Sequence, residues 1–167
     1  LQSRGLGDVY KRQVDDILII PSWEEVKPED KDKMIIHIDP GTAFGTGMHE
    51  TTQLCMRQLK KYVKDGMEIL EVGTGSGILS IAALKLGAGH AVGTDLDPCA
   101  ISATRENLEA NQIPEGSMDV MIGNIIDDNR SETMTDLFGH IGPERVNRYR
   151  KMRVVLTNPF HGKTQPG

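Results

Sequence analysis

Short apolar runs alternate with longer stretches of helical periodicity along this chain. A short apolar run fits a buried strand, whereas apolar positions that recur with the helical repeat fit one face of a helix. The predicted strands cover residues 17–20, 34–38, 69–72, 91–94, 118–122 and 153–156. The predicted helices cover residues 50–64, 78–86 and 98–111. From residue 69 onward strands and helices alternate, which predicts an α/β fold with a parallel sheet.

The turn that follows the strand at 69–72 is rich in glycine and has the pattern Gly73-x-Gly75-x-Gly77. A helix follows it directly, and Gly87 stands just after the end of that helix. A strand, a glycine turn and a helix in this order are the usual way in which an α/β sheet holds a nucleoside-bearing cofactor. We therefore predict a cofactor site at this turn, with Gly73 and Gly75 against the ligand.

Two carboxylates flank the turn and bear on the class of cofactor. Glu71 stands two residues before Gly73, and Asp95 follows Gly73 by 22 residues at the end of the next predicted strand. A dinucleotide fingerprint requires G-x-G-x-x-G, and Ile78 occupies the position of its third glycine. A carboxylate such as Glu71 can hold an ammonium group directly or through water, and Asp95 would accept hydrogen bonds from two ribose hydroxyls. The dinucleotide alternative stays open at this point.

Residues 39–52, D-P-G-T-A-F-G-T-G-M-H-E-T-T, are the most specific stretch of the sequence. With E-V-G-T-G-S-G-I-L-S-I-A-A-L-K-L-G-A at 71–88 and G-T-D-L-D-P-C-A-I at 93–101, they resemble the ribosomal protein L11 methyltransferase (PrmA) family. That family belongs to the class I S-adenosylmethionine (SAM) methyltransferases. The resemblance covers residues 34 to about 128 and weakens after that.

The resemblance implies a Rossmann-like class I SAM-dependent methyltransferase fold, of which this chain supplies about four of seven central strands. In the family the loop at 39–52 closes over SAM, and a Thr at the position of Thr52 contacts it. The resemblance also assigns the first glycine of the turn to Gly73 and the ribose carboxylate to Asp95. N-terminal capping of the helix at 50–64 is another role for Thr51 and Thr52, and both roles can hold together.

The candidate catalytic residue is Asn158, which follows the predicted strand at 153–156. In the family the corresponding strand ends in A-N-I-L, and its Asn faces cofactor and substrate. Here Pro159 and Phe160 replace Ile and Leu, and the sequence Asn158-Pro159-Phe160 resembles the N-P-P-[YF] motif of other amine methyltransferases. In that motif the Asn side chain and the next carbonyl grip the target nitrogen. The alternative for Asn158 is that it only forms a turn at the end of the strand. Asn124 follows the predicted strand at 118–122, and a role as a loop cap is favoured there over a place near an adenine ring.

Composition and charge exclude several other classes of protein. The chain has 167 residues, a net charge of −5 and a mean hydropathy of −0.35. It has no apolar run long enough to span a membrane, and its excess of acid argues against nucleic-acid binding. Cys55 and Cys99 lack C-x-x-C spacing, which suits a reducing cytoplasm and argues against structural zinc. We expect a cytoplasmic protein with no metal and no direct contact to membrane or nucleic acid.

Three regions are expected along the chain. Residues 1–13 begin with Leu, lack periodicity and are expected to be a non-native leader. Residues 14–33 are expected to be a linker from a missing N-terminal substrate domain, with the charged stretch 24–33 exposed to solvent. Residues 34–167 are expected to be a partial SAM-binding methyltransferase domain. We therefore expect a fragment of a longer protein, poorly stable and with little turnover by itself.

The resemblance implies a SAM-dependent methyltransferase that modifies lysine side chains and the N-terminus of a ribosomal protein of the large subunit. Desolvation in a closed site favours the neutral amine, so no dedicated base is required. An amine methyltransferase of another substrate class, such as glutamine or a nucleobase, is an alternative suggested by Asn158-Pro159. A non-catalytic module that binds SAM or a nucleotide is another, because the predicted sheet is incomplete.

Overall fold

Four parallel strands form the sheet that carries the glycine turn. The computed structural model describes residues 11–39, 50–123 and 154–157. The strands lie in the order β6-β5-β4-β7, with bounds β4 (Glu68–Val72), β5 (His90–Asp95), β6 (Met118–Ile122) and β7 (Val154–Thr157). Because all pairs are parallel, the carboxyl ends of the four strands meet at one edge of the sheet. The chain order reverses between β4 and β7, and such a switch point is where α/β sheets bind ligands.

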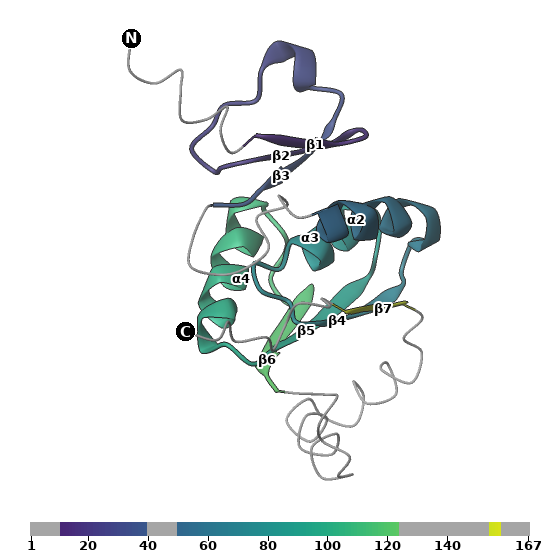
Figure 1. Cartoon of the computed structure of the whole chain (residues 1–167), viewed down its shortest axis with the longest axis vertical. Coiled ribbons are helices and arrows are strands. Elements are labelled where there is room, and N and C mark those ends of the chain that lie inside the picture. Colours follow the sequence, from purple (N-terminus) through teal and green to yellow (C-terminus); the bar gives the residue numbers. More distant parts are fainter. Residues whose placement is uncertain (1–10, 40–49, 124–153, 158–167) are drawn as a thin grey trace.

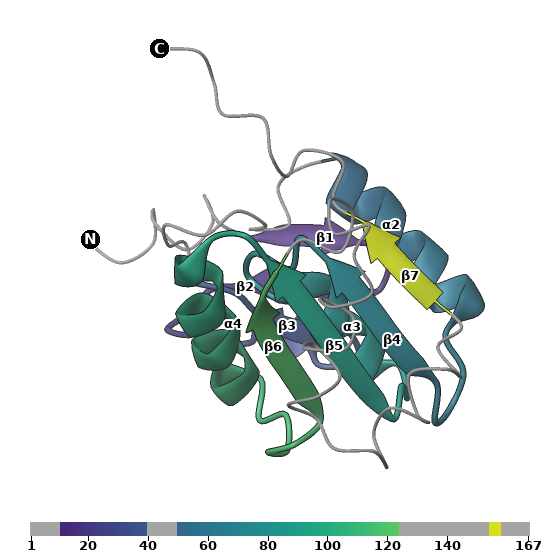
Figure 2. The same ribbon diagram turned by 90° about the horizontal axis from the view of Figure 1, so that it is seen from below.

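Three helices accompany this sheet: α2 (Glu50–Tyr62), α3 (Ile78–Lys85) and α4 (Pro98–Ala110). Figures 1 and 2 show α3 and α4 on the same face of the sheet, because the chain steps from β4 to β5 to β6 in one direction. Six residues of α3 are buried, which explains why its sequence is apolar on nearly all sides. The predicted α/β fold with a parallel sheet is confirmed.

The core lies between this face of the sheet and the helices. Ile69 of β4 and Ala91 of β5 are fully buried there with Ile81 of α3. In α2 the buried residues are Met56 and Leu59, whereas Leu54 and Tyr62 are about half exposed. The face of α2 that packs against the core is therefore the one that carries Met56 and Leu59.

A second, three-stranded sheet lies beyond the helices, in the order β1-β2-β3 (Figure 1). Its strands are β1 (Arg12–Val14), β2 (Ile17–Ile20) and β3 (Met34–His37), and all four residues of β2 are buried. Arg12 and Gln13 belong to the segment that was expected to be a leader, yet they pair with β2. Three residues are too few to show a periodicity, so this strand is detectable only from its pairing.

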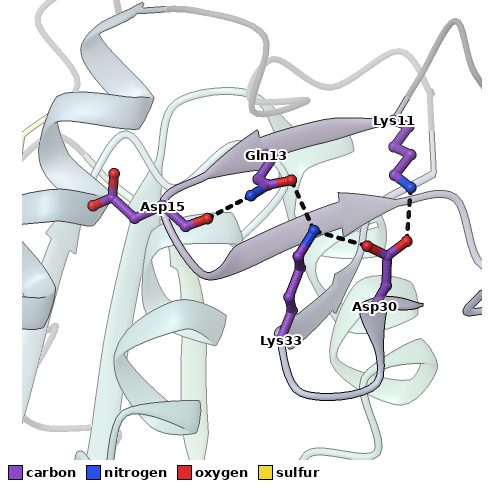
Figure 3. A network of polar contacts seen from close by, with 5 residues as sticks. All are labelled: Lys11, Gln13, Asp15, Asp30 and Lys33. Carbon is purple, nitrogen blue, oxygen red and sulfur yellow. Dashed lines mark hydrogen bonds and ion pairs between the residues drawn. The ribbon is translucent and has the colours of Figure 1, made fainter. Parts of the chain in front are cut away.

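The charged stretch 24–33, expected to be exposed, contains the short 3-10 helix η1 (Pro28–Asp30) and one buried carboxylate. Asp30 is 3% exposed and forms ion pairs with Lys11 at 2.7 Å and with Lys33 at 2.8 Å. Lys33 also donates a hydrogen bond to Gln13 of β1, so the network joins three segments of the chain (Figure 3). These ion pairs lower the pKa of Asp30, with Lys11 the larger cause. The expectation that this stretch is exposed is therefore wrong at Asp30, because Lys11 and Lys33 compensate its buried charge.

Within the described ranges, none of the helices is long and apolar enough to cross a lipid bilayer.

Candidate functional site

The glycine turn leaves the carboxyl end of β4 in a conformation that suits glycine at three alternating positions. Gly73, Gly75 and Gly77 have φ values of 78°, 53° and 78°, in the left-handed region that other residues rarely adopt. The amides of Gly73 and Thr74 donate to the carbonyl of Thr94 at 2.7 and 3.0 Å. The turn is therefore anchored to the end of β5, where the second carboxylate lies.

Asp95 ties the turn to the loop after β5. It is 1% exposed, and its Oδ2 accepts a hydrogen bond from the amide of Gly75 at 2.7 Å. Its Oδ1 accepts one from the amide of Asp97 at 2.9 Å. Asp97 in turn caps α4 through the amide of Cys99, and Pro98 occupies the first turn of this helix. The buried carboxylate of Asp95 is thus held in a fixed direction beside the turn.

Glu71 holds the turn from the opposite side. It is 2% exposed, and its Oε2 accepts hydrogen bonds from the Thr74 hydroxyl at 2.9 Å and the Ser80 amide at 3.1 Å. The Ser80 hydroxyl donates to the same oxygen. These partners all belong to the turn and to the first turn of α3. They support an indirect role of Glu71, through the shape of the turn, better than direct contact with an ammonium group.

The two carboxylates give the site a negative potential. Burial raises the pKa of Glu71 from 4.5 to about 7, although the hydrogen bonds from Ser80 and Thr74 oppose the shift. The nearby negative charge of Asp95 adds to the rise in this pKa. A cationic ligand at the turn would favour the ionised form of Glu71, and an anionic ligand would oppose it.

Two exposed apolar side chains lie at the same edge of the sheet. Leu96 directly follows β5 and is 48% exposed, and Ile122 ends β6 and is 58% exposed. The amide of Gly123 donates to the carbonyl of Asp95 at 2.9 Å, which keeps the two strand ends together. This edge therefore offers an apolar surface next to a carboxylate, as a nucleoside would require.

Four of the predicted site residues, Glu71, Gly73, Gly75 and Asp95, come together in the structure. Thr52 is half-buried within the first turn of α2, which begins at Glu50. Thr51 and Thr52 therefore lie within the described helix and not at its N-cap, so the capping role does not apply to them. Asn158, Asn124 and the signature residues 40–49 lie outside the described residues.

Sequence reasoning missed the buried polar side chains of α3 and α4. Ser80 lies in an apolar helix, Asn107 is buried in α4, and Asn111 is buried at its C-cap. The available signal was their spacing: Thr104, Asn107 and Asn111 recur with the helical repeat, as buried residues do.

Comparison with known proteins identifies the family. The model of the ribosomal protein L11 methyltransferase (PrmA) family matches residues 11–138. A ribosomal protein L11 methyltransferase of Agathobacter rectalis is 53% identical over 137 residues, which cover 80% of this chain and 41% of the relative. One of Lachnospira eligens is 58% identical over 115 residues, which cover 69% of this chain and 36% of the relative. The chain thus spans well under half the length of these relatives.

A solved structure agrees with this assignment. The ribosomal protein L11 methylase of Lactobacillus delbrueckii subsp. bulgaricus superposes with a TM-score of 0.64 and 30% sequence identity, covering 86% of this chain and 75% of that one. The parallel sheet, the glycine turn and Asp95 therefore belong to a class I methyltransferase fold, present here in part. On the family match and these relatives, the chain belongs to the ribosomal protein L11 methyltransferase (PrmA) family.

Proposed function

We propose that this chain is the SAM-binding part of a methyltransferase that acts on amino groups of ribosomal protein L11. The observation that carries the cofactor assignment is the carboxylate of Glu71 at the N-terminus of α3. A helix N-terminus is the position at which dinucleotide-binding folds place a pyrophosphate. Here Glu71 already accepts the hydrogen bond of the Ser80 amide, so this amide is not available to a pyrophosphate, and the ionised form of Glu71 would repel one.

A cofactor with a sulfonium and an ammonium group fits the same surroundings. Glu71 and Asp95 are both buried beside the turn, and both attract positive charge. Both oxygens of Asp95 accept backbone amides, and a carboxylate oxygen can accept more than one hydrogen bond, which is the chemistry that holds ribose hydroxyls. Leu96 and Ile122 provide apolar surface for an adenine ring at the adjacent strand ends. Thr52, Gly73 and Gly75 complete the proposed cofactor site.

The bound cofactor would supply a methyl group already activated on sulfur. The task of the chain is then to hold a neutral amine in line with that methyl group. Exclusion of water favours the neutral form of a lysine amine, whose ordinary pKa is about 10.4. We propose that Asn158, the next residue in the sequence after β7, orients the amine through its side-chain oxygen. The amine nitrogen would form a bond to the methyl carbon as the carbon–sulfur bond breaks, which leaves the cofactor as a neutral thioether. The methylated ammonium would then lose its extra proton to solvent.

The substrate proposal rests on the family and on the names of the relatives, which are ribosomal protein L11 methyltransferases. Lysine side chains and the N-terminus of that protein are the proposed targets. A second candidate is an amine methyltransferase of another substrate class, favoured by the Asn158-Pro159-Phe160 sequence. Transfer of labelled methyl to ribosomal protein L11, compared with free glutamine peptides and nucleobases, separates the two candidates.

Calorimetric titration with SAM tests the site residues. Asp95→Ala should weaken binding by at least about tenfold, because hydrogen bonds to a charged acceptor are lost. Gly73→Arg should abolish binding, because arginine disfavours the positive φ and would fill the turn. Asp97→Ser, which keeps a capping oxygen for α4, is the matched control and should bind as the unaltered chain does. Unchanged affinity in both Asp95→Ala and Gly73→Arg would remove the assignment.

A further inference from the structure

The helix α4 presents a stripe of buried polar side chains toward the glycine turn. Thr104, Asn107 and Asn111 are 0%, 5% and 6% exposed. Their spacings of three and four residues place them on one face of the helix. Buried polar groups are costly unless they are hydrogen-bonded, so the partners of these side chains indicate what the stripe does.

Two members of the stripe bind consecutive carbonyls of the turn. The hydroxyl of Thr104 donates to the carbonyl of Gly75 at 3.0 Å, and Nδ2 of Asn107 donates to the carbonyl of Ser76 at 2.9 Å. Because a trans peptide unit is planar, a carbonyl turned toward α4 turns the following amide away from it. The two bonds therefore set the direction of the backbone amides that follow them in the turn.

The fit between α4 and the turn is tight. A Cβ atom at Gly77 would lie 2.7 Å from Cγ2 of Thr104, closer than real contacts allow. Asn107 also accepts a hydrogen bond from the amide of Asp39 at 3.4 Å, through Oδ1. Asp39 immediately precedes the segment 40–49 of the family signature. One side chain thus contacts both the turn and the chain that leads into that segment.

Asn111 has different partners. Its Oδ1 accepts from the amide of His37 at 2.9 Å, and its Nδ2 donates to the carbonyl of His37 at 2.6 Å and to that of Asn107 at 2.7 Å. It binds the backbone of β3 as a neighbouring strand would, and none of these three hydrogen bonds goes to the turn. It is therefore a matched control, a buried asparagine at the C-cap of the same helix.

We propose that Thr104 and Asn107 are positioning residues of the cofactor site. They hold the carbonyl side of the glycine turn against α4, so that the backbone of the turn keeps the shape that the ligand would meet. The inference takes its ligand, SAM, from the proposed function. The effect of Thr104 and Asn107 on the shape of the turn does not depend on any ligand. Neither residue is a catalytic residue.

Three single variants test the proposal by SAM calorimetry at pH 5.5 and pH 8. Thr104→Val keeps the shape and removes the donor, and should weaken binding about tenfold at both pH values. In Asn107→Asp the ionised carboxylate has no donor for the Ser76 carbonyl, whereas the protonated form has one. Its affinity relative to the unaltered chain should fall about tenfold at pH 8 and recover at pH 5.5. Asn111→Asp should lower the melting temperature while its SAM affinity stays within about threefold.

Amide hydrogen exchange of the ligand-free protein gives an independent result. The amides of Gly75 and Gly77 donate to Asp95 and to the carbonyl of Thr74, so they report on the shape of the turn. In Thr104→Val, and in Asn107→Asp at pH 8, both amides should exchange about tenfold faster than in the unaltered chain. The amide of Val92 in β5 should change by less than about threefold. If the unaltered chain failed to bind SAM, the proposed function would be wrong. The amide exchange rates of the ligand-free protein would then still test whether Thr104 and Asn107 hold the turn. The inference would be overturned if the turn amides exchanged at an unchanged rate, or if Val92 exchanged faster by the same factor. It would also be overturned if Asn107→Asp lost the same SAM affinity at pH 5.5 as at pH 8.

Discussion

Glu71 caps the helix α3 through Ser80, nine residues further along the chain. The residue at the N-cap of α3 is Gly77, which has no side chain to accept a hydrogen bond. The Oε2 atom of Glu71 accepts from the Ser80 amide at 3.1 Å and from its hydroxyl, so the strand before the turn supplies the cap. A cap usually satisfies one of the first free amides of a helix, and here the capping group is also a buried charge beside the ligand site.

The first prediction concerns Glu71→Gln and the pH dependence of stability. Because burial raises the pKa of Glu71 from 4.5 to about 7, the folded chain binds more protons than the unfolded chain between these values. The stability that this group contributes is complete below pH 4.5 and is lost as the pH rises through about 7. The loss is roughly 3 kcal/mol by order of magnitude.

Urea unfolding of both proteins between pH 4.5 and pH 8 measures this effect. Glutamine cannot titrate, so the unaltered chain should lose free energy of unfolding relative to Glu71→Gln as the pH rises. A constant difference between the two proteins across this range would show that Glu71 does not titrate as described.

The second prediction compares two glycines with the same backbone conformation. Gly77 and Gly116 have φ values of 78° and 80°, but a Cβ atom would clash with Thr104 only at Gly77. Gly116→Ala should cost roughly 1 kcal/mol for the left-handed backbone alone. Gly77→Ala should cost about 2 kcal/mol more, because the tightly packed Thr104 must shift.

A double-mutant cycle identifies the cause of that difference. Thr104→Ser removes Cγ2 but keeps the hydroxyl that binds Gly75. The cost of Gly77→Ala should therefore fall by about 1 kcal/mol or more in the Thr104→Ser background. Strictly additive free energies of unfolding would rule out the contact as the source.

The third prediction concerns the connection between α4 and the three-stranded sheet. Asn111→Ala leaves the amide and carbonyl of His37 without their side-chain partners, and should destabilise the chain by about 2 kcal/mol. Glu106→Ala, an exposed position on the same helix, is the control and should change stability little. Chemical unfolding measures both, and equal values for the two variants would contradict the prediction.

The fourth prediction concerns the carboxylate of Asp30. The ion pairs with Lys11 and Lys33 lower its pKa, so its contribution is present above the ordinary value of 3.8 and is lost as the pH falls below it. Asp30→Asn should lower the melting temperature at pH 7, and the gap should close in acid. Asp16→Asn breaks an ion pair with Lys60 at a side chain that is 65% exposed, and should have a smaller effect. A larger effect of Asp16→Asn at pH 7 would refute this ranking.

Much of the larger sheet was predictable because its strands are short apolar runs that alternate with helical stretches. The glycine turn and the place of Asp95 after the next strand followed from short-range patterns and from the family resemblance. β1 and the buried Asp30 were not predictable, because their stability comes from partners distant in sequence. Arg12 and Gln13 become a strand only when β2 is beside them, and Asp30 becomes buried only when Lys11 and Lys33 compensate its charge.

The site shows the same limit. Glu71 was chosen for its charge and its place before the turn, but its contacts with Thr74 and Ser80 depend on how the turn folds back. Asn107 and Asn111 resemble ordinary polar residues of an exposed helix when the sequence is considered alone. Their partners lie 31 and 74 residues away in the chain, so that only the folded structure could reveal their role.

The central claim is that the glycine turn, flanked by two buried carboxylates, binds a cationic nucleoside cofactor and not a pyrophosphate. Parallel calorimetric titrations of the unaltered chain with SAM and with NAD test it most directly, followed by SAM titration in excess NAD. We predict saturable binding of SAM that excess NAD does not weaken, and no measurable heat with NAD. Binding of NAD that SAM displaces, or an absence of SAM binding, would contradict the account.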